Sequence, residues 1–379
     1  IGKIRKLNGQ PELNKVFDNN DMELVIKQDK QAEAKNTDYG YYYILDEKNV
    51  IIYPDGANEE YSSLAIRITN QKGVDSYKES SISYGSSQSL LIEKSEVYKP
   101  SGAKIQGERN DNEIVFSNLE IGDVVVFKYR KQNFVSGRFA KEFTDNYFFN
   151  GQIYTAITRY SLLAPASLKL NFKNSNFNLQ PVVKDVEDFK QYTWELKNAE
   201  PFKNEPKMPL LIDICPGVHI STMSSWKDIS DWYSDVTNNN AETDFEIVEL
   251  YKKLFPADTK SATQFQKARI IYDYIEDNIS YSYVSFRQSA FVPQRPSATL
   301  TTRLGDCKDL SSLFVTLARM AGIQAQMVLV NTRDNGENAM VLPSMDFNHC
   351  IAKVKLDNKD YYIELTDKYL PFTSLPNNV

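Results

Sequence analysis

The sequence predicts an α+β protein, in which an N-terminal antiparallel β-sandwich or rolled sheet is followed by a domain of helices packed on an antiparallel sheet. Two observations support this prediction. Short strand-like runs separated by turn signals continue to about residue 209, and helical spacing begins after a stretch that is rich in proline. We therefore expect a β-rich domain over residues 1–209, a proline-containing junction over 210–224 and a core domain over 225–379.

The strands of the first domain are predicted from runs that alternate in polarity or are rich in β-branched residues. Clusters of Asn, Asp, Gly and Ser separate these runs, which is typical of short antiparallel strands joined by turns. The clearest runs cover residues 50–53, 63–68, 122–129 and 167–172. Helical periodicity is weak there, so a sandwich or rolled sheet is favoured.

The change of pattern follows four prolines at positions 201, 206, 209 and 216. Each proline removes a backbone donor and restricts the residue before it, so regular helix is excluded there. From Ser225 onward, Trp226, Ile229, Trp232 and Tyr233 recur at helical spacing. Such an aromatic stripe is more typical of a helix core than of a ligand platform.

The second domain continues with a helix and three strands. The helix starts at Cys307 and ends near Gly322, a residue that commonly terminates helices. The strands are predicted over residues 325–330, 347–356 and 361–365. The last two are expected to form a hairpin around Asp357 and Asn358.

Composition limits the partners of the chain. Its 379 residues contain 44 Lys and Arg against 50 Asp and Glu, a net charge of -6. A surface that tracks nucleic-acid phosphates draws on an excess of positive charge, so nucleic acid is a disfavoured partner. No run approaches the ~20 apolar residues of a transmembrane helix. Because Ile1 is not a start methionine, we expect that an export signal would lie in a preceding segment.

The run GDCKDL over residues 305–310 places Cys307 in the first turn of a buried helix. The positive end of the helix dipole and the unpaired N–H groups there favour a thiolate, which is the form of a cysteine nucleophile. The Cys307 backbone N–H could also bind the oxyanion of a tetrahedral intermediate. The alternative is a small buried apolar residue, but the charged neighbours Asp306, Lys308 and Asp309 disfavour it.

His349 is the candidate base, because a nucleophilic cysteine needs an imidazole that takes up its proton and returns it to the leaving group. It lies on a predicted strand, and the alternative is a core histidine. Two carboxylates on the next strand, Glu364 and Asp367, could orient it. If the hairpin loop has an even number of residues, His349 shares a face with Glu364 and Thr366. We therefore choose Glu364 and place Asp367 second.

The remaining cysteines and histidine are assigned no chemistry. Cys350 falls on the strand face opposite to His349 and is expected to fill the core. Cys215 and His219 are four residues apart, but two ligands fall short of the four usual in a structural zinc site. The sequence therefore predicts neither a metal nor a cofactor.

Several short sequence motifs, occurring in the expected order, make the second domain resemble the bacterial transglutaminase-like superfamily, whose cores are papain-like. They are GDCKD at 305–309, AGI at 321–323, LPS at 342–344 and FNH at 347–349, within a stretch from Trp226 to Pro376. The first domain resembles the domain of unknown function that commonly precedes this core in envelope proteins of Bacteroidetes. The motif near the end of this domain that fits the resemblance is WELKN at 194–198.

The resemblance implies Cys307 as nucleophile, His349 as base and Glu364 as the residue that orients the base. Relatives usually have Asp at this last position, and the extra methylene of Glu364 either shifts the strand or weakens the triad. The side-chain donor to the oxyanion is open between Gln294, Gln288 and Tyr283, and we take Gln294 first.

The implied activity is acyl transfer through a cysteine, with hydrolysis of a peptide, isopeptide or other amide bond favoured over cross-linking. No loop of alternating acidic residues is present, so a calcium-dependent cross-linker is disfavoured. The family context implies an exported protein of the periplasm or envelope with a peptide or other cell-envelope amide as substrate. The alternative is a scaffold or binding protein with an idle papain-like core.

Overall fold

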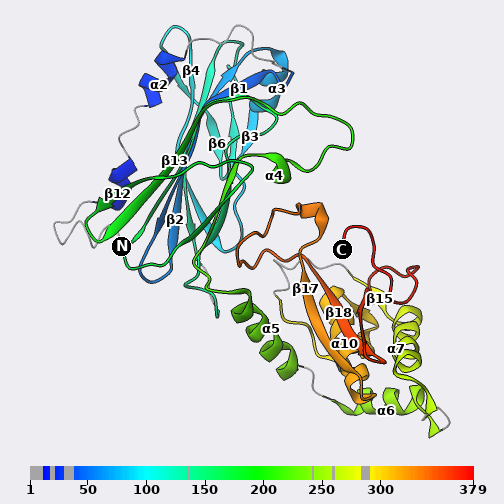
Figure 1. Ribbon diagram of the computed structural model, residues 1–379. Coiled ribbons are helices and arrows are strands. Elements are labelled where there is room, and N and C mark those ends of the chain that lie inside the picture. Colours follow the sequence, from blue (N-terminus) through cyan, green and yellow to red (C-terminus); the bar gives the residue numbers. More distant parts are fainter. Residues whose placement is uncertain are drawn as a thin grey trace. The chain divides into compact units, whose positions relative to one another are not determined.

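Long strands dominate the first half of the computed structural model, which describes residues 12–17, 22–29, 38–134, 137–240, 243–257, 261–282 and 291–379. The chain divides into two units, Ile1–Thr222 and Met223–Val379. Figure 1 shows strands in the first unit and mixed helices and strands in the second. The predicted α+β class with a β-rich first domain is confirmed.

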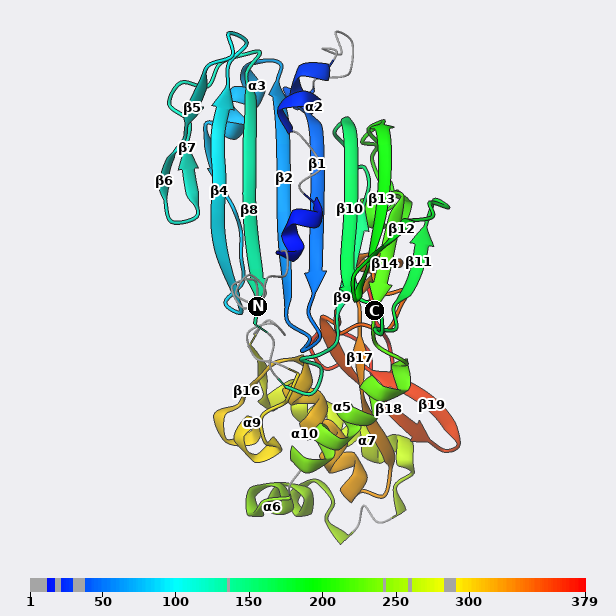
Figure 2. The same cartoon turned by 90° about the vertical axis from the view of Figure 1, so that its left-hand side faces the viewer.

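The first unit is built on an eight-stranded sheet with the order β12-β13-β10-β1-β2-β8-β4-β5. Its strands are β1 (Tyr41–Ile52), β2 (Asn58–Ile68), β4 (Gln88–Tyr98), β5 (Lys104–Gln106), β8 (Val124–Asn133), β10 (Thr155–Pro165), β12 (Val182–Val186) and β13 (Phe189–Ala199). Figure 2 shows the long central strands side by side. Neighbours are antiparallel as predicted, except that β1 and β10 are parallel. The long stretch of chain between these two strands provides the crossover that a parallel pair requires.

A second sheet packs on the first through aromatic and aliphatic side chains. Its strands are β9 (Thr144–Phe148), β11 (Asn171–Ser175) and β14 (Gly217–Ser221), in the order β11-β14-β9. Val218 and Ile220 of β14 join the buried cluster of Tyr160 and Trp194 on the large sheet. The stretch predicted as a junction, 210–224, therefore contains a strand of the first unit, because alternate β14 side chains are needed to complete this core.

Smaller elements complete the first unit. They are the 3-10 helix η1 (Leu13–Phe17), the helices α2 (Met22–Gln28), α3 (Gln71–Tyr77) and α4 (Leu211–Ile214), and the strands β3 (Glu79–Ser81), β6 (Glu108–Asn110) and β7 (Glu113–Val115). The three short strands form a sheet of their own in the order β3-β7-β6.

The second unit surrounds one buried helix. Its helices are α5 (Trp226–Asn240), α6 (Phe245–Leu254), α7 (Gln264–Asn278), α9 (Pro296–Thr302), α10 (Cys307–Met320) and the 3-10 helix η3 (Arg333–Asn335). Its strands are β15 (Ser280–Tyr281), β16 (Leu304–Gly305), β17 (Gln324–Val330), β18 (His349–Leu356) and β19 (Lys359–Ile363). In the described part of the chain, no helix has the length and apolar character to cross a membrane.

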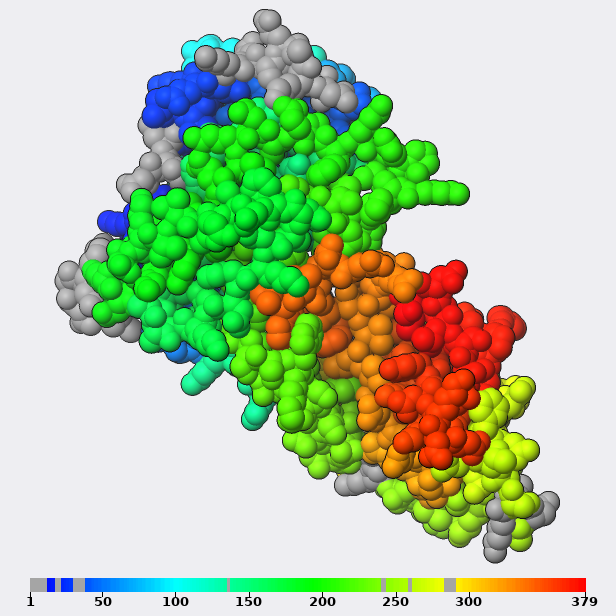
Figure 3. Space-filling view, in the orientation of Figure 1, coloured from blue at the N-terminus to red at the C-terminus, as the bar shows by residue number. Residues whose placement is uncertain are grey.

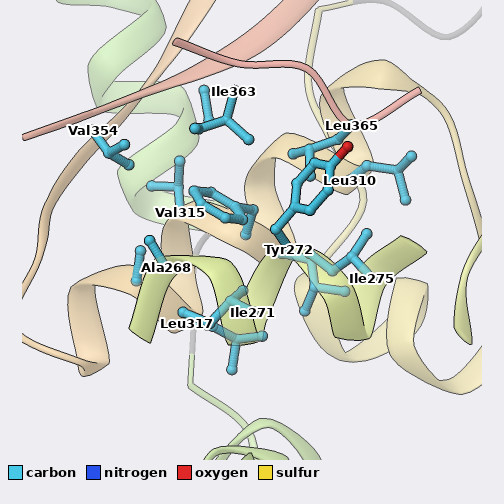
Figure 4. Close-up of a cluster of buried hydrophobic side chains, with 14 of the residues drawn as sticks. Ala268, Ile271, Tyr272, Ile275, Leu310, Val315, Leu317, Val354, Ile363 and Leu365 are labelled. Carbon is cyan, nitrogen blue, oxygen red and sulfur yellow. The ribbon is translucent and has the colours of Figure 1, made fainter. Parts of the chain in front are cut away.

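Helix α10 lies between α7 and the antiparallel sheet β17-β18-β19. All its residues from Cys307 to Ala318 are buried. Figure 4 shows Ile271 of α7, Leu317 of α10 and Ile363 of β19 within this core. Burial of one such side chain contributes about 1.5–3 kcal/mol, so the helix is held along its length and its first turn has a defined position.

A two-residue turn connects β18 and β19. Asp357 and Asn358 have φ of 47° and 67°, the left-handed conformation that a type I′ hairpin turn requires at both positions. Leu356 pairs with Lys359 and Ala352 with Ile363. The predicted hairpin is therefore confirmed, and its loop has the even number of residues that was the condition for choosing Glu364. Continuing this register places Thr366 opposite His349, with Glu364 as a diagonal neighbour on the same face.

We expect the Asn358→Val substitution to weaken this hairpin, because a β-branched residue in the left-handed region costs roughly 1–2 kcal/mol. Hydrogen exchange should show faster exchange of the β18 and β19 amides in the variant. Asn358→Gly is the matched control, since glycine adopts this φ without strain. Equal protection in both variants would contradict the proposed role of the turn.

Candidate active site

The first turn of α10 is fixed by a capping box. The Asp306 carboxylate accepts hydrogen bonds from the backbone N–H groups of Lys308 (3.1 Å) and Asp309 (3.3 Å). In return, the Asp306 N–H donates to the Asp309 carboxylate at 3.1 Å. The local sequence thus forms the reciprocal cap that starts many helices. It places Cys307 at the first helical position.

Burial governs the protonation of Cys307, which is only 4% exposed. It raises the pKa of the thiol, and the neighbouring Cys350 and Asp306 act in the same direction. The Lys308 ammonium and a hydrogen bond from the Cys350 backbone oppose the rise in the pKa, but they do not outweigh it. The predicted preference for thiolate at the helix N-terminus is therefore overridden, because the sulfur lies in an apolar environment.

Two side chains that sequence reasoning assigned to the core surround this sulfur. Cys307 forms a buried cluster with Tyr233 of α5 and Cys350 of β18. The Tyr233 hydroxyl lies 3.6 Å from the Cys350 sulfur. The alternation of β18 predicts that Cys350 lies on the face opposite to His349, but no local pattern indicates that this face meets Cys307. That contact depends on how α10 packs on the strand.

His349, the first residue of β18, contacts Glu364. Its Nε2 and the Glu364 Oε2 are 2.7 Å apart. The imidazole is 13% exposed and the carboxylate 1%. Of the two carboxylates considered, the structure thus brings Glu364 to His349. Asp367 is exposed and accepts a backbone hydrogen bond from Tyr369.

The Glu364 carboxylate is held by further contacts just beyond β19. Its second oxygen, Oε1, accepts hydrogen bonds from the N–H groups of Leu365 (2.9 Å) and Thr366 (2.8 Å) and from the Thr366 hydroxyl (2.8 Å). Burial by itself raises the pKa of the carboxyl, but the bonds from His349 and Thr366 outweigh it, so the pKa lies below its ordinary value. The segment after β19 then runs over the surface, in red in Figure 3.

Cys307 of α10 packs against Cys350, which follows His349 on β18. Within the described residues, no hydrogen bond joins the Cys307 sulfur to the His349 ring. The sulfur is instead buried in the cluster with Cys350, the residue next to His349. The structure therefore places the thiol beside the strand position that carries the imidazole, with its side chain turned toward the core.

Gln294 holds the segment that leads into α10. Its backbone N–H donates to the Asp309 carboxylate at 2.8 Å. Its side-chain amide donates to the other oxygen of Asp309 and to the Leu304 carbonyl, both at 3.1 Å. Gln294, which the sequence analysis places first as side-chain donor to the oxyanion, thus uses its amide to hold the first turn of α10. Tyr283 and Gln288 lie outside the described residues.

Lys308 follows the cysteine and is also buried, being 2% exposed. Its ammonium forms an ion pair with the Asp306 carboxylate, which is 3% exposed. The sequence showed charged neighbours of Cys307 but not that this pair would be removed from water. The pair matters because a buried carboxylate without a partner beside Cys307 would be strongly unfavourable.

The other histidine lies in the first unit. His219 is buried in β14, with its ring nitrogens 2.8 Å from the Asn146 side-chain oxygen and 3.1 Å from the Ser175 hydroxyl. Burial lowers the pKa of His219 to about 4, with a smaller effect from Lys173. It is therefore a neutral histidine whose two nitrogens both contact side chains of the sheet.

Comparison with known families agrees with this organisation. Residues 54–203 match the family model of a Domain of Unknown Function with a solved structure (DUF3857), and residues 254–364 match the Transglutaminase-like superfamily. No curated protein matches the chain. The predicted resemblance to both families is confirmed.

Among solved structures, a candidate protease from Parabacteroides distasonis superposes with a TM-score of 0.68 at 18% identity, over 89% of this chain and 72% of that one. A candidate cysteine protease from Cytophaga hutchinsonii superposes with a TM-score of 0.26 at 12% identity, over 59% and 78% of the two chains. The first likeness shows the fold: a large β-rich N-terminal part followed by a transglutaminase-like core.

We expect the contribution of Glu364 to stability to depend on pH. Because its folded-state pKa is lowered, the ionised carboxylate stabilises the fold above the unfolded pKa of about 4.3, and this stabilisation is lost as the pH falls through the folded value. Glu364→Gln should therefore lose roughly 1.5–3 kcal/mol at pH 7 and less near pH 3. Chemical denaturation across this pH range measures the difference. Asp367→Asn is the exposed control, and an equal response of both variants would contradict this assignment.

Replacing Lys308 by Met should destabilise the second unit by roughly 3–5 kcal/mol, because Asp306 is then buried without its partner. The double variant Asp306→Asn/Lys308→Met should recover much of the loss, since Asn still caps a helix. Thermal and denaturant unfolding provide the measurement. Lys353→Met removes an exposed ion pair with Asp360 and should leave the transition unchanged. A Lys308→Met protein as stable as this control would show that the buried pair is not needed.

Proposed function

We propose that this chain, a β-rich domain of unknown function followed by a transglutaminase-like core, is a cysteine-dependent hydrolase that cleaves a peptide, isopeptide or other amide bond through a thioester on Cys307. One observation carries the proposal. Cys307 begins a buried helix beside β18, and the first residue of that strand, His349, is hydrogen-bonded to the buried Glu364. The family match supports an enzyme of this general kind, and the mechanism is our inference.

Acylation requires the Cys307 side chain to leave its core position. Rotation about χ1 moves the sulfur between staggered positions without moving the helix. His349 Nε2 is engaged by Glu364, so Nδ1 is the ring nitrogen assigned to the thiol. As the sulfur attacks the carbonyl carbon, its proton passes to Nδ1. The C–N bond then breaks, and the amine leaves with that proton.

Hydrolysis of the thioester completes the cycle. Water attacks the acyl carbon while His349 accepts one of its protons, the C–S bond breaks, and the proton returns to the sulfur. Glu364 orients the ring and stabilises the imidazolium that forms in each half of the cycle. Its three other hydrogen bonds keep the carboxylate in place while the histidine changes charge.

The oxyanion donor that we assign is the backbone N–H of Cys307, at the first helical position of α10. Gln294 would have to give up its bonds to Leu304 and Asp309 before its amide could take part. The raised pKa of the resting thiol favours transfer of the proton during attack over a preformed thiolate–imidazolium pair.

The substrate and location that we propose rest on the resemblance to envelope proteins. We place the protein in the periplasm or envelope and assign it a peptide or other amide of the cell envelope. Hydrolysis is favoured over cross-linking because the sequence has no loop of alternating acidic residues that would bind the calcium of a calcium-dependent cross-linker.

A catalytically idle scaffold is the second candidate. It is favoured by the absence, within the described residues, of a hydrogen bond between Cys307 and His349, and by the burial of the thiol. In this case the papain-like core would serve as a folded support, and the χ1 rotation of Cys307 would have no function.

Activity profiling on peptide, isopeptide and muropeptide libraries tests the enzyme. We expect cleavage that is abolished in Cys307→Ala and reduced at least ~100-fold in His349→Ala, because a general base contributes 10²–10⁴-fold. Cys215→Ala, which alters a buried cysteine of the first unit, is the control and should retain activity. Alkylation of Cys307 by iodoacetamide, read by peptide mass, should slow in His349→Ala. An alkylation rate independent of His349, together with no cleavage, would favour the scaffold.

A further inference from the structure

A groove of about 250 Å³ lies along α5 in the second unit. One wall is formed by α5 and the opposite wall by β17, with Phe347 and Arg319 completing the lining. The α5 residues that line it run from Trp226 to Thr237. At 1.5 Å per residue these two positions are about 17 Å apart, so the groove has the length of a short extended peptide.

The inner wall of this groove is shared with the cluster around Cys307. Tyr233 lines the groove and also belongs to the buried cluster with Cys307 and Cys350. Met327 and Leu329 of β17 line the groove and pack against the same cluster. A peptide bound in the groove would therefore lie within one side-chain layer of the proposed nucleophile.

The end near the start of α5 is aromatic. The rings of Trp226 and Phe347 meet edge to face, with centroids 6.2 Å apart. Trp226 is 42% exposed, so part of its ring is available to a ligand. Phe347 is two residues before His349, which places this aromatic pair on the side of the proposed base. A large apolar side chain would remove these rings from water.

The other end carries a positive charge. Arg319 donates from Nη1 to the Asn238 side chain at 2.7 Å and from Nε to the Ala325 carbonyl at 2.9 Å. These two bonds use two of its five N–H donors and fix the direction of the guanidinium. No carboxylate is among the described residues that line the groove. The groove is thus complementary to a negatively charged group at this end.

We propose that this groove selects the acyl donor, which is a peptide segment with a large apolar residue at the Trp226–Phe347 end and an acidic residue about three positions away at Arg319. The inference rests on the proposed function, because it makes the groove part of the substrate site of Cys307. Four extended residues span roughly 13 Å, and their side chains cover the remaining length of the groove.

Binding to the Cys307→Ala protein tests the inference without turnover. The probes are three N-acetylated, C-terminally amidated tetrapeptides: Phe-Ala-Ala-Glu, Phe-Ala-Ala-Gln and Ala-Ala-Ala-Glu. By calorimetry we expect the first to bind about tenfold or more tightly than either of the others. Arg319→Met should remove the difference between the Glu and Gln probes, and Trp226→Ala should remove the advantage of Phe. Arg319→Lys should retain only part of the preference for the Glu probe over the Gln probe, because the lysine ammonium lacks the planar set of N–H donors of a guanidinium.

Each outcome bears on the inference. Equal binding of the three probes, or no binding of any at millimolar concentration, overturns it. Should Arg319→Met fail to fold, Trp226→Ala still decides, because the side chain that it removes is partly exposed. If the probes bind as expected but the wild-type protein cleaves no library member, the proposed function fails and the groove stands as a peptide-binding site. If cleavage depends on Cys307 without preference for Phe or Glu, the function stands and the groove assignment fails.

Discussion

The reciprocal cap between Asp306 and Asp309 is the constraint on which the second unit depends. It determines where α10 begins, and the apolar face of α10 then determines how α7 and the β17-β18-β19 sheet pack. The same cap also binds Gln294 and, through Asp306, Lys308. A few polar groups removed from water thus position the thiol, because each has a partner and none can move without losing one.

The burial that defines this position also raises the pKa of the Cys307 thiol. Its sulfur is in an apolar cluster, where the charged form is disfavoured. His349 on the adjacent strand contacts a carboxylate that accepts three further hydrogen bonds. In the proposed mechanism the base is therefore preorganised and the nucleophile is buried, so that reactivity would depend on movement of the sulfur out of the core.

Local patterns were sufficient for much of this arrangement. The helix start at Cys307 and the parity of the β18–β19 hairpin both follow from neighbours in sequence, and they led to Glu364 in preference to Asp367. What the sequence did not show depends on contacts between distant segments. Tyr233 meets Cys350 across more than a hundred residues, and burial of Lys308 follows from the packing of the whole helix. The nearby prolines are the strongest local signal around β14 and favour a junction there, while the need to fill the core beside Trp194 is not visible in one segment.

The turn at Asp357 and Asn358 has a consequence for how this protein can vary. Since side chains alternate along a strand, inserting or deleting a single residue there would carry Glu364 to the reverse side of the sheet and separate it from His349. Changes of two residues would keep the side but shift the carboxylate by about 7 Å along the strand. A loop at the surface, which would ordinarily tolerate changes in length, is therefore held to one length by a contact several residues away.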